Sequence, residues 1–397
     1  MLNINNFYNT KDIKRFYQPT KIFFGKNSKS LIFDLCVKNK IILLLVTKSF
    51  SKDPFIKQIN KAYKNTVLLL LHGEPKTSFI NETLNNIPKK IDYIIAIGGG
   101  SVIDSAKAIY AKKIYGSYKR LGYGEKRFIK PITNHHKITL IALPTTAGSG
   151  SEVSRYYLIS DEKTKEKTVS RSWLICPEYA ILDPYFLKKA SKKILILGAF
   201  DAFIHLLETY ISRFEQSMFT DILILDGIPR ILKTMDKILL NIKLNDDDYL
   251  NLQFASTLAG ISISNVRTGF IHDVGEAISA ETDLSHPETL FVFFESIMNL
   301  YDHRFFKKKI LLINKLNKEQ IKLKSFKDIG VFWRKVFERE NLITNIKNKL
   351  NSSRINKDFI LMKVMSDKVL VTKESPVKLN EKNIKLIISK SLKLLNS

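Results

Sequence analysis

Four side chains that suit a divalent metal occur in two short segments of this chain. Asp201 and His205 lie four residues apart in GAFDAFIHLLETY, and His272 and His286 lie 14 residues apart in GFIHDVGEAISAETDLSHPETL. Three of the seven histidines therefore belong to this set. One carboxylate and three imidazoles form a ligand set that binds Fe²⁺ or Zn²⁺. Together with a glycine-rich loop upstream, the set predicts metal-assisted redox chemistry.

Each of these four residues has an ordinary explanation when it is taken alone. A single histidine is usually a partly buried side chain, and an aspartate and a histidine at positions i and i+4 form a common surface pair on a helix. The prediction of a metal centre therefore depends on all four residues and on the glycine loop.

The spacing of His272 and His286 predicts a break in helical structure. In one unbroken helix, the 14 residues between them would span roughly 21 Å at about 1.5 Å per residue, so the two side chains could not share an ion. The segment 281–285 supplies a break, and Pro287 suits the first turn of a new helix. We expect a helix, a loop and a second helix that begins at His286.

The glycine-rich loop follows an apolar strand and opens a helical segment. It reads Gly98-Gly99-Gly100-Ser101, and Asp104 follows three residues later. Glycines permit close backbone approach, and a helix N-terminus offers unpaired N–H groups to a phosphate. The pattern is not GxGxxG, so the usual dinucleotide fingerprint is absent and a tight strand-to-helix turn is the alternative. Three consecutive glycines favour phosphate binding.

A second loop of small residues, PTTAGSGSE, also follows a predicted strand. Its hydroxyl groups belong to Thr145, Thr146, Ser149 and Ser151. A flat ring and its phosphates could lie against such a loop. The alternative is an ordinary serine- and glycine-rich linker.

The elements that must position these residues change character half way along the chain. Short apolar runs alternate with helical segments in the first half, which is typical of βαβ units around a parallel sheet. In the second half, apolar residues recur at spacings of three and four, as in an all-α domain. We predict an α/β domain at residues 1–184 and an all-helical domain at residues 185–397. The predicted strands are Ile41–Thr47, Thr66–Leu71, Tyr93–Ile97, Ile138–Leu143, Tyr156–Ser160 and Tyr179–Leu182.

The overall composition fits a globular protein of two domains. The 397 residues exceed one ordinary core, and 45% of them are hydrophobic. A formal net charge of +26 could indicate a nucleic-acid partner. The lysines are interleaved with apolar residues, as in Lys307–Lys324. A solvated lysine-rich surface is therefore the better interpretation, and we expect no nucleic-acid partner.

The cysteines and the apolar runs indicate the cellular location. Cys36 and Cys176 form no CxxC motif, and thiols in such numbers are typical of a reducing compartment. The first residues lack the apolar core of a signal peptide, and runs such as Ile41–Val46 are too short to span a membrane. We expect a cytoplasmic protein without a membrane span.

Several of these segments together resemble the iron-containing (group III) alcohol dehydrogenase family. The matching segments are GGGSVIDSAKAI, ALPTTAGSGSEVSRY, LDP, GAFDAFIHLLETYIS and the 14-residue spacing of His272 and His286. Weaker similarity extends towards both ends, so the resemblance spans nearly the whole chain. It implies an α/β dinucleotide-binding domain with a parallel sheet, followed by an all-α metal-binding domain, with the active site in the cleft between them.

The resemblance also implies a reaction and its cofactors. NAD or NADP would be held by the glycine loop and by the region from Thr145 to Ser149, and Fe²⁺ or Zn²⁺ by Asp201, His205, His272 and His286. Hydride would pass between the cofactor and a small alcohol or aldehyde, with the metal polarising the substrate oxygen. The resemblance further implies a homodimer or a larger homo-oligomer.

Three positions depart from the family's usual pattern. Glu276 stands where the family often has a histidine near the substrate, four residues after His272, which suggests a changed proton relay or substrate polarity. Lys48 stands where NAD-preferring relatives often carry an acid that bonds the ribose 2′-hydroxyl, so NADP could be tolerated. Pro287 follows His286 in place of the usual glycine.

Other functions remain open at this point. The enzyme could be specialised for a sugar, a sugar acid or a phosphorylated polyol. A catalytically degenerate cofactor-binding protein or a basic nucleic-acid-binding protein are alternatives of a different class. Glycerol-1-phosphate dehydrogenase and dehydroquinate synthase share the implied fold, but the aspartate and three histidines argue against those activities.

Overall fold

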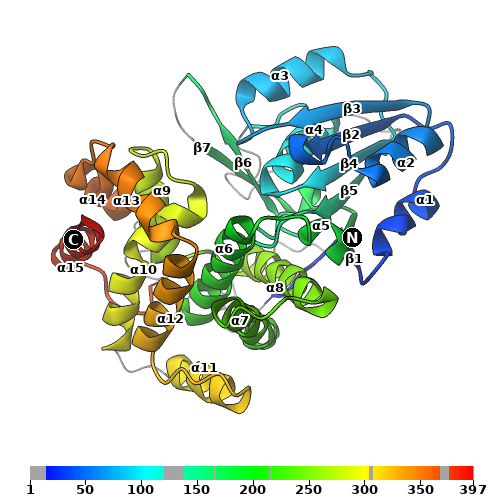
Figure 1. The fold of residues 1–397 in the computed structure, drawn as a ribbon. Coiled ribbons are helices and arrows are strands. Elements are labelled where there is room, and N and C mark those ends of the chain that lie inside the picture. The colour runs from blue at the N-terminus through cyan, green and yellow to red at the C-terminus, as the bar shows by residue number, and fades with distance from the viewer. Residues whose placement is uncertain are drawn as a thin grey trace.

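The first half of the chain forms a parallel sheet with helices on both faces, and the second half is helical (Figure 1). In this computed structural model, the described residues are 15–119, 137–163, 167–213, 217–303, 307–366 and 375–396. The six-stranded sheet has the order β1-β8-β5-β4-β2-β3, and every pairing in it is parallel. Its strands are β1 (Lys21–Phe24), β2 (Ile42–Thr47), β3 (Thr66–Leu71), β4 (Tyr93–Gly98), β5 (Thr139–Pro144) and β8 (Tyr179–Leu182). Both the α/β class and the parallel sheet match the expectation from the sequence.

The central strands are apolar throughout because helices cover both of their faces. In β2, alternate side chains such as Leu43 and Leu44 enter two different cores. One core includes α3 (Thr77–Asn86) and α4 (Gly100–Tyr115). The other includes α1 (Ile32–Leu35) and α2 (Pro54–Ala62). This packing explains why no polar alternation is visible in the sequence of β2 or β4.

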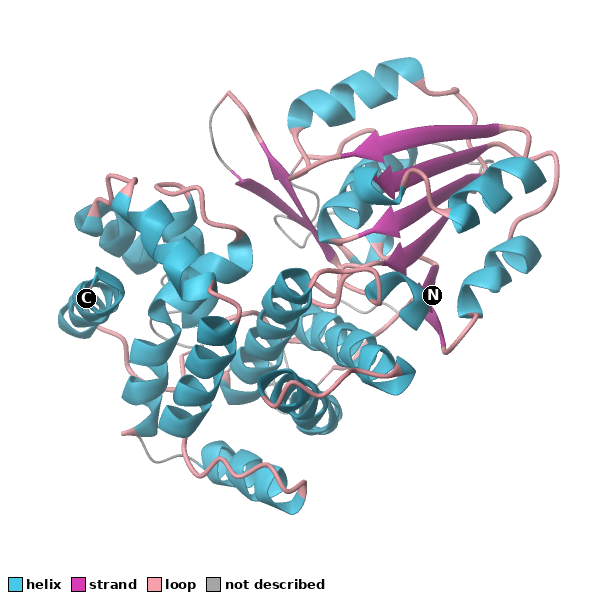
Figure 2. Ribbon diagram, viewed as in Figure 1, coloured by secondary structure: helices cyan, strands magenta, loops and turns pink. Residues whose placement is uncertain are grey.

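A separate antiparallel hairpin, β6 (Tyr156–Ser160) and β7 (Lys167–Arg171), projects beside the sheet (Figure 2). Tyr157 and Ile159 of β6 are buried against α4. The strand predicted at 156–160 is therefore present, but it lies outside the parallel sheet.

The remaining helices form the second half of the molecule (Figure 2). Phe186 of the short helix α5 packs in a core of the α/β half, and the adjacent Leu187 packs in the core of the helical half. The chain therefore passes from one core to the other within a single turn. The helices are α5 (Pro184–Leu187), α6 (Lys192–Ile211), α7 (Met218–Leu239), α8 (Asp246–Asn265), α9 (Phe270–Ser279), α10 (His286–Asp302), α11 (Lys307–Lys318), α12 (Phe326–Arg339), α13 (Leu342–Asn351), α14 (Lys357–Ser366) and α15 (Glu381–Asn396).

Helix α6 is the central element of the helical half. Its length and apolar composition would be enough to cross a membrane, but 89% of its most apolar stretch is buried inside the structure. Phe200 of α6 packs edge-on against Phe294 and Trp333 of neighbouring helices. Such packing is typical of the core helix of a folded domain. The helix thus gives Asp201 and His205 a rigid support.

Candidate metal centre and cofactor crevice

Three helices bring the predicted metal ligands together. Asp201 and His205 lie one turn apart on α6, His272 lies in the first turn of α9, and His286 is the first residue of α10. Helix α9 ends at Ser279, and six residues, 280–285, separate it from α10, which has Ser285 as its N-cap and Pro287 in its first turn. The predicted helix–loop–helix arrangement is confirmed. Because of this break, two histidines 14 residues apart reach the same point.

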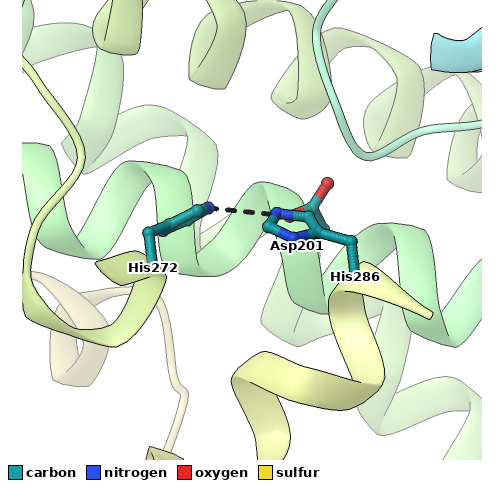
Figure 3. A group of neighbouring side chains, drawn as sticks. All are labelled: Asp201, His272 and His286. Carbon is teal, nitrogen blue, oxygen red and sulfur yellow. Dashed lines mark ion pairs between the residues drawn. The ribbon is translucent and has the colours of Figure 1, made fainter. Parts of the chain in front are cut away.

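The nitrogens of the three histidines surround one oxygen of Asp201. The Nε2 atoms of His205 and His272 each lie 3.9 Å from Oδ1 of Asp201. The Nε2 atom of His286 lies 3.5 Å from the same oxygen. Figure 3 shows the rings of His272 and His286 directed at the carboxylate of Asp201 from different helices.

The fourth predicted ligand, His205, lies beside the other three, but its ligand atoms are not within the same short distance of all of them. Ligand atoms of Asp201, His272 and His286 all lie within 4.8 Å of one another, and His205 is not part of this group. Its ring is stacked on that of His272, with the centroids 4.5 Å apart.

The burial of these side chains tests whether they fit a cation. Oδ1 of Asp201, Nδ1 of His205 and Nε2 of His272 are buried and have no hydrogen-bond partner among the described residues. Burial raises the pKa of Asp201, and burial followed by the neighbouring His272 lowers the pKa of His205. Two of these unpaired atoms, Oδ1 of Asp201 and Nε2 of His272, lie 3.9 Å apart, and such buried atoms are costly unless a cation satisfies them. The residues present therefore fit a divalent metal.

His286 gives this group access to the outside. Its side chain is 34% exposed, whereas those of Asp201 and His272 are 7% and 4% exposed. A small molecule could therefore approach from the side of His286.

Sequence reasoning missed Glu208, which holds His272 in place. Its Oε2 atom lies 2.6 Å from Nδ1 of His272, and its two oxygens accept hydrogen bonds from the backbone N–H groups of Gly269 and Ile271. Burial alone would lower the pKa of His272, but the hydrogen bond and charge of Glu208 raise it. A carboxylate in this position fixes the ring so that Nε2 faces Asp201. The available signal was a second acid, two turns after Asp201, in the apolar helix α6.

The predicted cofactor loops lie at the carboxyl ends of interior strands of the sheet. The chain leaves β2 through α2 towards β3 on one side, and leaves β4 through α4 towards β5 on the other. Ligands of open α/β sheets bind where neighbouring strands diverge in this way, beyond their carboxyl ends. Thr47-Lys48 and Gly98–Ser101 both lie at this position.

At these strand ends, Gly98, Gly99 and Gly100 leave no room for side chains of their own. A Cβ atom on Gly98 would lie 2.6 Å from Oγ1 of Thr47. One on Gly99 would lie 3.1 Å from Oγ1 of Thr146, and one on Gly100 would lie 2.7 Å from Oγ of Ser149. The two predicted cofactor loops are therefore in contact, with backbone and hydroxyl groups along their junction.

Two other predicted cofactor residues take different positions. The carboxylate of Asp104 accepts hydrogen bonds from the hydroxyl of Ser151 and, at 3.0 Å, from the backbone N–H of Leu158. This side chain ties α4 to the second loop and to β6. Lys48 is exposed at the start of a short 3₁₀ segment, Lys48–Phe50, directly after β2. A direct cofactor contact for either residue stays a prediction.

The second loop also reaches the metal ligands. A Cβ atom on Gly148 would lie 2.9 Å from the Cα atom of Gly198 in α6 and 3.3 Å from Oδ2 of Asp201. The second loop, which contacts Gly99 and Gly100, therefore passes directly beside Asp201. This contact brings the second predicted cofactor loop next to the predicted metal ligands.

Comparisons with known proteins agree with this arrangement. The family profile "Iron-containing alcohol dehydrogenase" matches residues 19–184, and the profile "Fe-containing alcohol dehydrogenase family, C-terminal" matches residues 195–392. An alcohol dehydrogenase of Thermococcus barophilus is 29% identical over 271 residues, which cover 65% of this chain and 69% of that protein. A 4-hydroxybutyrate dehydrogenase of Clostridium kluyveri is 29% identical over 282 residues, 68% of this chain and 72% of the relative.

Solved structures show the same fold. An iron-containing alcohol dehydrogenase from Thermococcus thioreducens has a TM-score of 0.76 at 23% identity, and the match covers 96% of this chain and 100% of the other. A sulfoacetaldehyde reductase from Bifidobacterium kashiwanohense in complex with NAD+ has a TM-score of 0.79 at 18% identity, over 96% and 99% of the two chains. The two family profiles, one for each half of the fold, place this chain in the iron-containing alcohol dehydrogenase family.

Proposed function

We propose that this protein is a metal-dependent oxidoreductase that transfers hydride between NAD(P) and a small alcohol or aldehyde. The observation that carries the proposal is the position of Asp201. Its Oδ1 atom is surrounded by three histidine nitrogens, and its Oδ2 atom lies beside the loop at Gly148. The names of the relatives, alcohol dehydrogenase and 4-hydroxybutyrate dehydrogenase among them, support the same reaction class.

The proposed ligands are Asp201, His205, His272 and His286. An Fe²⁺ or Zn²⁺ ion held there supplies Lewis-acid chemistry that polarises a substrate oxygen. Glu208 orients His272, and the partial exposure of His286 leaves a side from which a small alcohol or aldehyde can enter. Asp201 contributes the one carboxylate charge in the set, so it balances part of the charge of a divalent ion.

The proposed cofactor site follows the two contacting loops. The N-terminus of α4, preceded by Gly98 and Gly99, presents backbone N–H groups and a positive dipole end to the pyrophosphate. Ser101 and the hydroxyl groups of Thr145, Thr146 and Ser149 offer further donors. The nicotinamide ring would then lie towards Gly148, on the side of the sheet edge that faces Asp201.

Glu276 is the proposed residue that distinguishes this site. It lies one turn after His272 on α9, is exposed, and its charge helps to raise the pKa of His272. A carboxylate in this place would receive or release the substrate proton, or would favour a substrate that bears hydrogen-bond donors. The alternative role of Glu276 is to orient a neighbouring group.

A direct experiment is an alcohol and aldehyde panel assayed with both NAD and NADP on protein loaded with Fe²⁺ or Zn²⁺. We expect metal-dependent change in nicotinamide absorbance with at least one substrate, and loss of that activity in the Asp201→Ala variant. A wild-type protein that binds the metal and either cofactor but turns over no substrate of the panel would contradict the proposed reaction. A protein that takes up no metal would contradict the proposed centre itself.

A further inference from the structure

One face of α8 holds the loop that carries the proposed nicotinamide contacts. Gln253, Thr257, Gly260 and Ser264 follow one another at spacings of four, three and four residues, so they lie along one side of the helix. Each of them contacts the segment 144–155. Helix α8 belongs to the helical half, whereas this segment leaves β5 of the sheet. The contacts therefore join the two halves of the molecule at the proposed cofactor site.

Three of the contacts are hydrogen bonds. Nε2 of Gln253 donates to the carbonyl of Pro144 at 3.2 Å, and the hydroxyl of Thr257 donates to Oε1 of Glu152 at 2.7 Å. The hydroxyl of Ser264 accepts from the backbone N–H of Arg155 at 3.1 Å. All of these groups are buried, so each bond that is lost would leave an unpaired polar atom.

The fourth contact is between two glycines. Gly150 has a φ of +58°, and a Cβ atom on it would lie 2.6 Å from the backbone nitrogen of Gly260. Conversely, a Cβ atom on Gly260 would lie 2.7 Å from the Cα atom of Gly150. Only backbone atoms are involved, so no flexible side chain can move aside. The loop therefore lies as close to α8 as two backbones can approach.

Helix α4 holds the same loop from the opposite side. Lys107 is fully buried, and its Nζ atom donates to the carbonyls of Ser154 and Tyr156 at 2.8 Å each. Asp104 accepts from the hydroxyl of Ser151. The segment between Pro144 and Tyr156 is therefore clamped between α4 and α8, and Gly148 protrudes from the clamp towards Asp201.

We propose that this face of α8 is a positioning surface, and that Gly260 and Thr257 set the distance between a bound nicotinamide ring and the metal centre. This inference rests on the proposed function, because it assigns a role in that hydride transfer. The reacting atoms must lie about 3–3.5 Å apart, and a displacement of about 1 Å can lower the rate about 100-fold. A clamp made of backbone contacts and buried hydrogen bonds keeps the loop within such limits.

The test compares Gly260→Ala and Thr257→Val with two matched controls. Gly330→Ala adds a methyl group to a buried helical glycine whose nearest neighbours lie 3.5 Å or more away. Thr234→Val removes a buried hydroxyl that bonds only within its own helix, at 3.0 Å to Arg230 O. Mn²⁺ in the metal centre speeds the nuclear relaxation of nearby nicotinamide protons, with an inverse sixth-power dependence on distance. This readout needs no substrate and no turnover.

We expect the two controls to melt as the wild type does. Gly260→Ala and Thr257→Val should melt at a lower temperature, because each disturbs buried contacts, but both should keep the wild-type metal content and stay folded at 25 °C. Gly260→Ala should weaken the Mn²⁺ effect on the nicotinamide protons and lower kcat about 100-fold, with a smaller change in cofactor affinity. Thr257→Val should also weaken the Mn²⁺ effect and lower kcat, but to a lesser degree. Neither control should alter the relaxation rate.

The possible outcomes separate the two proposals. If Mn²⁺ affects bound NAD equally in wild type, Gly260→Ala and Thr257→Val, the positioning role is wrong even if the enzyme is active. If the Mn²⁺ effect falls as expected but no substrate is turned over by the wild type, the positioning role stands and the proposed reaction is wrong. If bound NAD in the wild type is unaffected by Mn²⁺, both proposals are overturned, because no nicotinamide then lies near the metal.

Discussion

Glu208 and His272 are joined by a contact of 2.6 Å between Oε2 and Nδ1, although 64 residues separate them in the sequence. The same carboxylate accepts the backbone N–H groups of Gly269 and Ile271, which lie on either side of the start of α9. Glu208 therefore fixes the ring of His272 and the helix that carries it in a single arrangement. The remaining ring nitrogen, Nε2, is left facing Asp201.

This arrangement predicts that Glu208→Gln weakens metal binding. The amide is nearly the same size as the carboxylate but has no charge and offers only one acceptor oxygen, so it cannot hold His272 and both backbone groups equally well. Loss of such a partner typically lowers metal affinity about 10- to 100-fold. Competition for Zn²⁺ against a chelator measures the affinity. Glu338→Gln, on the far surface of α12, is the control, and equal affinities in both variants would contradict the positioning role of Glu208.

The sequence allowed the elements around the site to be predicted well, because their apolar patterns are determined locally. The strands at 66–71, 93–97 and 138–143 read as buried on both faces, and all three lie in the parallel sheet. The expected burial of 66–71 on both faces is wrong, because β3 is an edge strand whose Leu68 and Leu70 are 36% and 43% exposed. The loop between His272 and His286 was predicted from the distance that a shared ion allows, from the break after Glu281 and from Pro287. Strands β1 and β7 were not predicted. Phe23 and Phe24 of β1 lie at the sheet edge, where burial is too incomplete to give a clear pattern.

Contacts between distant segments were not predictable from the pattern. Nothing in the sequence near Gly260 indicates that its backbone meets Gly150, and nothing near Glu208 indicates that it meets His272. The hydrogen bonds that the carboxylate of Asp104 accepts from Ser151 and Leu158 were not predicted either, and its predicted cofactor contact stays a prediction. Such pairings depend on how the two halves of the chain pack, and a single sequence does not encode that packing as a periodic signal.

The contact between the two cofactor loops predicts a loss of cofactor binding in Gly99→Val. A Cβ atom on Gly99 would already lie 3.1 Å from Oγ1 of Thr146, and the larger valine would fill the junction where the backbone N–H groups are exposed. We expect the dissociation constant of NADH or NADPH to rise about tenfold or more, which corresponds to about 1.4 kcal/mol. Fluorescence titration of the reduced cofactor measures it. The dissociation constant should stay at the wild-type value in Gly330→Ala, and an unchanged value in Gly99→Val would place the phosphates elsewhere.

Lys48 predicts how the enzyme chooses between NAD and NADP. It is exposed at the end of β2, where an acid would accept the ribose 2′-hydroxyl and repel a 2′-phosphate. Lys48→Asp should therefore lower kcat/KM for NADP relative to NAD by about tenfold or more. Lys52→Asp makes the same charge change four residues away and should leave the ratio unaltered. If the ratio of kcat/KM for NADP to kcat/KM for NAD falls equally in both variants, the cause is a general effect of surface charge and not a contact of Lys48.

Glu319 predicts a defined dependence of stability on pH. Its carboxylate is bound by Nζ of Lys233 at 2.7 Å and Nζ of Lys315 at 2.8 Å, and these hydrogen bonds lower its pKa from 4.5 to about 2. Because the pKa in the folded state is the lower one, its stabilising effect is present above pH 4.5 and is lost as the pH falls towards 2. Glu319→Gln should be less stable than wild type at neutral pH. Urea denaturation at several pH values should show the two proteins converging in stability as the pH falls through this range, and a constant difference would contradict the role of Glu319.

Glu276 gives the sharpest test of what distinguishes this site from its relatives. If its carboxylate carries the substrate proton, Glu276→Ala should lower kcat about 100-fold, because general acid–base catalysis contributes about 10²–10⁴-fold. The metal content should not change, since Asp201, His272 and His286 gather without it. In Glu276→Ala, kcat should no longer rise or fall over the pH range in which this carboxylate titrates. Glu276→His should restore part of the rate, with the change in kcat moved to a different pH.

The control for Glu276 is Asp283→Ala, which removes one exposed negative charge from the connection between α9 and α10. A general electrostatic effect on a positively charged protein would appear equally in both variants. A proton relay would appear only at Glu276, and only in kcat and its pH profile. If Glu276→Ala keeps both the rate and the pH profile of the wild type, the carboxylate merely orients a neighbour, and the substrate proton must leave through another group on the exposed side of His286.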